Sequence, residues 1–61
     1  MTLYSITKND SYVKADTGGR VTTPLWESAE KFTTQKSAIE MATYYGKVNN
    51  CKYDVVKVSY R

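Results

Sequence analysis

Residues 34–46 read TQKSAIEMATYYG, and this segment determines the architecture that we expect for the whole chain. Its apolar side chains recur at the helical spacing i, i+3, i+4, i+7. This stripe consists of Ala38, Met41, Ala42 and Tyr45. Thr34 is a suitable N-cap residue, with Thr33 as the other candidate, and Gly46 is in position to end the helix. The segment therefore predicts an amphipathic helix from about residue 35 to residue 45.

Two strands joined by a turn are predicted before the helix. Residues 1–8 alternate apolar and small polar side chains, as half-buried strands do. A turn cluster at residues 9–11 separates them from a second strand at residues 12–15. The paired glycines that follow supply the positive φ of another tight turn. Residues 20–23 are therefore either a third strand or a continuation of the second.

Two further segments complete the expected fold. Residues 25–32 follow a proline and carry apolar side chains at three-residue spacing, which favours a short helical turn. Residues 51–60 form the last strand, which has apolar residues on both faces. One face holds Val56, Val58 and Tyr60, and the other holds Cys51, Tyr53 and Val55.

The order β-β-(β)-α-β is that of an α+β protein. We expect a single domain over residues 1–61, with a small antiparallel sheet of three to four strands and the helix packed on one face. The core candidates are Tyr4, Ile6, Trp26, Phe32, Met41, Ala42, Val56 and Val58. In so small a domain one helix covers only one face of the sheet, which leaves the other face for a partner.

The composition excludes several classes of protein. The chain has 61 residues, one cysteine and no histidine, so an intrachain disulfide, a Cys/His zinc site and the histidine-dependent nucleophile systems are ruled out. We predict that the protein is not an enzyme, binds no cofactor or metal and has no small-molecule substrate. A domain of this size buries only about 60% of its unfolded surface, so we expect a homo-oligomer or a partner to stabilise it.

Location can also be inferred from the sequence. Residues 1–8 lack the apolar region of a secretory signal, and no segment approaches the roughly 18 apolar residues of a membrane-spanning helix. The single thiol of Cys51 indicates a reducing compartment. We therefore predict a cytoplasmic protein without membrane contact.

Three features that resemble chemical motifs have simpler explanations. Residues 16–20, DTGGR, lack the Gly-Lys-Ser/Thr ending of a phosphate-binding loop, and a hairpin turn explains them. Glu27 and Glu30 could face one way on a helical turn, where a solvated helix face explains them. Cys51 has the pattern of an inert, half-buried thiol.

The candidate binding surface is the sheet face that the helix leaves uncovered. We assign to it Tyr12, Lys14, Tyr53, Val55 and Lys57. The first hypothesis is a non-enzymatic protein-interaction module, in which the tyrosines supply buried contact and the lysines complement an acidic patch. Substituting Tyr53 and Lys57 together should then abolish partner capture without unfolding the domain.

Two other functions fit the same surface. A small nucleic-acid-binding protein could use the lysines to follow phosphates and the tyrosines to stack bases. The net charge of +3 is modest for that function. A structural subunit of a larger assembly would instead form a stable oligomer.

Three short motifs and the valine-rich last strand resemble small, mostly uncharacterised proteins encoded by phages and prophages of Gram-positive bacteria. The motifs are residues 3–6 (LYSI), 29–34 (AEKFTT) and 37–42 (SAIEMA). The resemblance spans most of the chain and carries over no functional residues. It implies an accessory protein that binds and inhibits or redirects a host protein, an inference by class alone.

Overall fold

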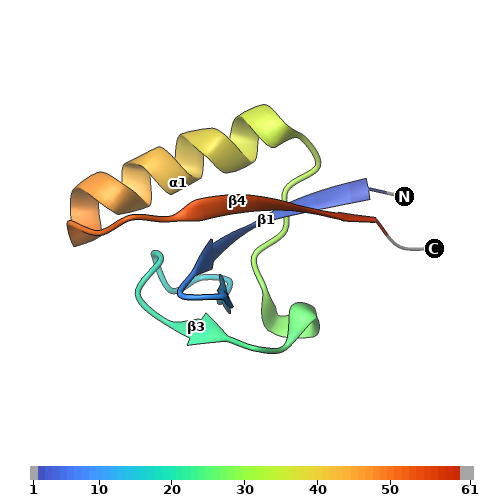
Figure 1. Ribbon diagram of the computed structural model, residues 1–61, viewed down its shortest axis with the longest axis horizontal. Coiled ribbons are helices and arrows are strands. Elements are labelled where there is room, and N and C mark those ends of the chain that lie inside the picture. The colour runs from blue at the N-terminus through green and yellow to red at the C-terminus, as the bar shows by residue number, and fades with distance from the viewer. Residues whose placement is uncertain (1, 60–61) are drawn as a thin grey trace.

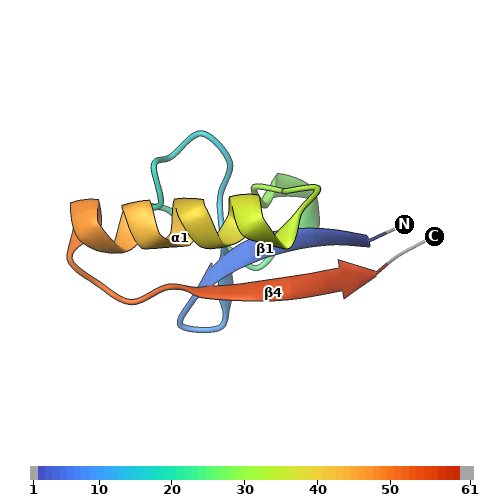
Figure 2. The ribbon, with the colours of Figure 1, turned by 90° about the horizontal axis from the view of Figure 1, so that it is seen from above.

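The computed structural model describes residues 2–59, and it contains a four-stranded antiparallel sheet in the order β3-β2-β1-β4. The elements are β1 (Thr2–Lys8), β2 (Ser11–Val13), β3 (Thr22–Thr23), the 3-10 turn η1 (Trp26–Ser28), α1 (Gln35–Asn49) and β4 (Asp54–Ser59). Helix α1 lies along one face of the sheet, as Figure 1 and Figure 2 show. The predicted α+β fold class and the β-β-(β)-α-β order are confirmed.

The first hairpin turns within two residues. Lys8 pairs with Ser11, and the intervening Asn9 and Asp10 have φ values of 53° and 67°. Two successive positive φ angles belong to the turn whose twist matches that of the flanking strands, and asparagine and aspartate tolerate this conformation best after glycine. The predicted turn is therefore confirmed.

The two strands of this hairpin separate soon after the turn, and residues 28–32 enter the gap. Tyr4 and Phe32 exchange two backbone hydrogen bonds of 2.8 Å each, and the N–H of Glu30 donates to the carbonyl of Val13 at 2.9 Å. The buried hydroxyl of Ser5 donates to the carbonyl of Glu30 at 2.7 Å. We call residues 28–32 the strap. The helical turn predicted over residues 25–32 is present only as η1, because the strap is extended to satisfy these backbone groups.

Helix α1 begins as predicted and ends later. The hydroxyl of Thr34 accepts from the N–H of Ser37 at 3.2 Å, so the predicted N-cap is confirmed. The prediction that Gly46 ends the helix is wrong. Asn50 has the left-handed conformation there, with φ 53° and ψ 49°, and its N–H donates to the carbonyl of Gly46. Asparagine can replace glycine at this position.

The core lies between α1 and the sheet. It is formed by Ile6, Val13 and Tyr45, with Phe32, Met41, Ala42 and Tyr53 packed around them. Four predicted core residues therefore lie in it or against it. Val13 and Tyr45 were missing from the predicted core.

The other predicted core residues lie elsewhere. Val56 pairs with Ser5, next to the pair of Ile6 with Val55, so Val56 and Val58 lie on the face away from α1 and are only half-buried. Trp26 is half-buried against Tyr12, and Tyr4 is half-buried as well. The last strand begins at Asp54 rather than at residue 51, and Tyr60 lies outside the described residues.

Candidate protein-interaction site

The five residues that the sequence assigned to one uncovered face lie on two opposite faces. Val55 pairs with Ile6, and Lys57 pairs with Tyr4. Directly opposed residues of antiparallel strands share a face, and Ile6 lies in the core beneath α1. Val55 and Lys57 are therefore on the helix face of the sheet. Tyr53 lies there too, with its ring centroid 5.9 Å from that of Tyr45 on the helix.

Tyr12 and Lys14 are on the face away from α1. Tyr12 pairs with Thr7 and precedes the buried Val13, whose side chain points toward the helix. The prediction of a single face formed by all five residues is therefore wrong. The error arises because the adjacent residues Val55 and Val56 place a valine on each face of β4. The alternation of apolar and polar residues then does not show which face is buried, and a shift of one residue moves every side chain to the opposite face.

Tyr53 is part of the fold rather than of a surface. Its hydroxyl donates to the carbonyl of Gly19 at 2.7 Å and accepts from Nδ2 of Asn49 at 3.0 Å. The same Nδ2 donates to the carbonyl of Gly18 at 3.0 Å. Burial raises the pKa of Tyr53 above its usual value. These bonds attach the glycine turn to the end of α1.

Tyr45 has a similar role at the strap. Its hydroxyl donates to Oε1 of Glu30 at 2.6 Å, and its side chain is only 4% exposed. Burial, followed by this hydrogen bond to Glu30, raises the pKa of Tyr45 well above its usual value. Glu30 is therefore a structural acceptor in this fold. The sequence had indicated instead a carboxylate on a solvated helical turn.

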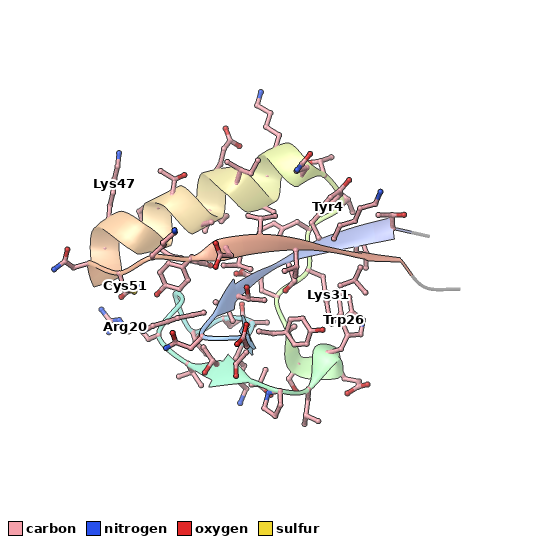
Figure 3. The ribbon with its side chains drawn as sticks, viewed as in Figure 1. Tyr4, Arg20, Trp26, Lys31, Lys47 and Cys51 are labelled. Carbon is pink, nitrogen blue, oxygen red and sulfur yellow. The ribbon has the colours of Figure 1, made fainter. Side chains whose placement is uncertain are left out.

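A small aromatic cluster lies on the face away from α1. The rings of Tyr12 and Trp26 meet edge to face with centroids 5.3 Å apart, and Nζ of Lys31 lies 4.9 Å from the centroid of the Trp26 ring. Figure 3 shows Trp26 and Lys31 side by side at one end of the molecule, with Lys47, Arg20 and Cys51 at the other. Tyr12 thus packs within the domain. No local sequence pattern predicts this cluster, since its members come from separate segments.

Two of the residues predicted for binding, Val55 and Lys57, lie on the edge strand β4. This strand pairs with β1 along its length and stands at the end of the sheet. Tyr4 uses both its N–H and its C=O to bond Phe32, on the side away from β4. Its partner Lys57 therefore directs its own N–H and C=O away from β1, because opposed residues without mutual bonds point their polar groups outward. The same alternation applies to Val55, the partner of Ile6.

Side chains on the helix face border this edge. Val55 is half-buried and Lys57 is exposed. A Cβ on Gly46 would lie 3.1 Å from the carbonyl of Cys51, so this flank of α1 faces the chain that leads into β4. Ile39 lies two helical turns earlier on the same flank and is 48% exposed. The edge of β4 and Ile39 together form the candidate site, which we call the β4 edge.

The described residues form no pocket, and no three of their cysteine, aspartate and glutamate side chains lie together as metal ligands would. No described helix is long and apolar enough to cross a membrane. The predictions of no catalysis, cofactor or metal stay predictions.

The chain was compared with known proteins in three ways. No protein-family model, no curated protein and no solved structure matches it.

Proposed function

We propose that this chain is a non-enzymatic protein-interaction module that accepts an extended segment of its partner at the β4 edge. The observation that carries the proposal is the outward direction of the N–H and C=O groups of Val55 and Lys57. A row of such groups on an edge strand is a template for pairing with another chain. The resemblance to phage-encoded proteins extends the proposal to an accessory factor that inhibits or redirects a host protein in the host cytoplasm.

Backbone pairing alone would give weak binding. Each added hydrogen bond contributes about 0.5–1.5 kcal/mol net, whereas association costs about 4 kcal/mol or more. Side chains must supply the remainder. Ile39 and Val55 provide apolar surface beside the edge, and completing the burial of one large aliphatic side chain contributes about 1 kcal/mol. The partner therefore has to contact the flank of α1 as well as the strand.

The alternative function, nucleic-acid binding, has lost its geometric support. It needed lysines and tyrosines on one face, and Tyr53 and Tyr12 now lie on opposite faces with their rings packed against Tyr45 and Trp26. A titration with single-stranded and duplex oligonucleotides at two salt concentrations still tests it, since phosphate contacts weaken steeply with salt. Self-association also stays a prediction, which sedimentation equilibrium can test.

Semisynthesis tests the proposed function at the level of single backbone atoms. Cys51 permits ligation of a synthetic 51–61 segment to residues 1–50. An N-methyl group on the backbone nitrogen of Lys57 removes the N–H that points away from β1 and sterically blocks an added strand. The pairing of β4 with β1 stays intact. The matched control carries the N-methyl group on Lys52, which is exposed and outside the strand. The N–H of Val56 points toward β1, so an N-methyl group there should destabilise the fold.

The proposal predicts differential capture from a nuclease-treated lysate of a Gram-positive bacterium. The unmodified protein and the Lys52 control should retain the same partner, and the Lys57 form should lose it. In the complex, hydrogen exchange at the amides of Val55 and Lys57 should slow, whereas in the free protein both should exchange faster than that of Val56. Equal capture by the Lys57 and Lys52 forms would refute the β4 edge as the binding site.

A further inference from the structure

We infer that the segment bound at the β4 edge carries a carboxylate directly opposite Lys57 and an apolar side chain opposite Val55. This inference rests on the proposed function and names the chemistry of the partner. The two positions are separated by one residue, so an antiparallel partner would present the sequence acidic-x-apolar. A second copy of this chain carries such a sequence in β4, Asp54-Val55-Val56, but the N–H and C=O groups of Asp54 point toward β1 and are not available to an added strand.

The backbone of β4 limits the register of any added strand. The backbone N–H and C=O groups of Val55 and Lys57 point away from β1. These residues can form hydrogen-bonded pairs only with partner residues whose own N–H and C=O groups point toward β4. Directly opposed side chains share a face. The partner residues opposite Val55 and Lys57 therefore both point to the helix side, where the exposed part of Ile39 lies.

Charge selects the residue opposite Lys57. Lys57 is exposed, and among the described residues it has no ion pair or hydrogen-bonded side chain. The nearest acid along β4, Asp54, lies on the other face, because it pairs with Thr7 rather than with Tyr4 or Ile6. A carboxylate from the partner would thus meet a lysine that no acid of β4 neutralises. Opposite charges that face each other across strands stabilise a pair, whereas like charges destabilise it.

A second copy cannot supply this carboxylate at the β4 edge. When two β4 strands pair antiparallel about a two-fold axis, a residue whose N–H and C=O point toward the other copy lies opposite another residue of the same kind. A residue whose N–H and C=O point toward β1 likewise lies opposite its own kind. Within β4, Lys57 then lies opposite Val55, Lys57 or Ser59 of the other copy, and it never lies opposite Asp54. One of these registers opposes two lysines directly. Lysine on an edge strand is a common means of preventing self-pairing.

Synthetic strands test the inference. The probes are nine-residue peptides of alternating threonine and valine with one glutamate placed two residues before a valine, together with matched glutamine and lysine versions. Binding to the full chain is followed by amide chemical shifts up to millimolar peptide. The glutamate peptide should bind about 2- to 5-fold more tightly than the glutamine peptide, and the lysine peptide should bind most weakly. Lys57→Glu, a substitution at an exposed residue, should reverse this order of peptide affinities.

Each other outcome overturns a definite claim. Equal affinity for all three peptides, lost on N-methylation of Lys57, would leave the proposed function standing and refute the carboxylate. Binding that survives this N-methylation, or no binding by any peptide, would refute the β4 edge itself. A dimer in sedimentation equilibrium that the N-methyl group dissociates would identify a second copy as the occupant and overturn the inference.

Discussion

The glycine turn at residues 18 and 19 provides a matched pair of substitutions that tests how this small domain is held together. Both glycines have positive φ, 65° at Gly18 and 82° at Gly19. A Cβ added to Gly18 meets no atom within 4 Å, whereas a Cβ added to Gly19 would lie 2.8 Å from Cγ of Tyr45. The two alanine variants therefore share the backbone strain and differ in the contact with the helix.

The magnitudes follow from these two causes. A left-handed conformation costs a residue with a Cβ about 1–2 kcal/mol, which both variants incur. Gly19→Ala must also displace Tyr45, which is 4% exposed and fixed by its bond to Glu30, and such overpacking costs a further 1–3 kcal/mol or so. A domain of 61 residues has a total stability of about 3–9 kcal/mol. Gly19→Ala can therefore unfold a large fraction of the protein.

Urea denaturation followed by circular dichroism measures the difference. A small domain loses about 1 kcal/mol of unfolding free energy per molar urea. The midpoint of Gly19→Ala should therefore lie about 1–3 M below that of Gly18→Ala, at equal slopes. Coincident midpoints would show that Tyr45 can move aside at no cost. The tight packing between the glycine turn and α1 would then be refuted.

Three further changes test other parts of the fold by the same denaturation assay. Tyr45→Phe should cost about 1–3 kcal/mol by leaving Glu30 without its donor. The pKa of Tyr45 is raised in the fold above its ordinary 10.0, so the Tyr45 hydroxyl stabilises the fold fully below pH 10 and progressively less as the pH rises further. Between neutral and alkaline pH, Tyr45→Phe should therefore lose less stability than the parent protein. Asn50→Gly should stabilise the end of α1 by several tenths of a kcal/mol, because glycine adopts the left-handed conformation of residue 50 more readily. A loss of stability would contradict the assignment of Asn50 as the left-handed residue that ends the helix. Thr34→Ala should cost about 1 kcal/mol with the loss of the N-cap bond, and an unchanged midpoint would exclude that role.

The local features of this fold could be predicted from the sequence because each depends on a few adjacent residues. The N-cap at Thr34, the apolar stripe of α1 and the turn at Asn9 and Asp10 are of this kind. The end of the helix was missed because glycine and asparagine can both end a helix, and the choice between Gly46 and Asn50 depends on packing. Gly46 lies inside α1, and its carbonyl accepts hydrogen bonds from the N–H groups of Asn50 and Cys51, which follow the helix.

The strap and the faces of β4 could not be predicted, for a different reason. The strap joins Tyr4 to Phe32 and Val13 to Glu30, and no local pattern encodes pairings between such distant residues. The alternation in β4 is ambiguous because valine occupies both faces at residues 55 and 56. Only the pairing of Ile6 with Val55 decides the question, and it follows from the tertiary fold.

Tyr53 and Lys57, which the sequence placed together in one binding surface, should now respond separately to substitution. Tyr53→Phe breaks the bond to Gly19 and the bond from Asn49, so it should cost about 1–3 kcal/mol of stability and leave the preference among charged peptides unchanged. Lys57→Glu removes no contact from the described fold, so it should reverse that preference at nearly constant stability. In a chain without a disulfide, tyrosine hydroxyls help to hold the turn and the strap, which leaves recognition to a backbone edge and a few side chains beside it. If Tyr53→Phe changed peptide preference while Lys57→Glu did not, this division between stability and recognition would be wrong.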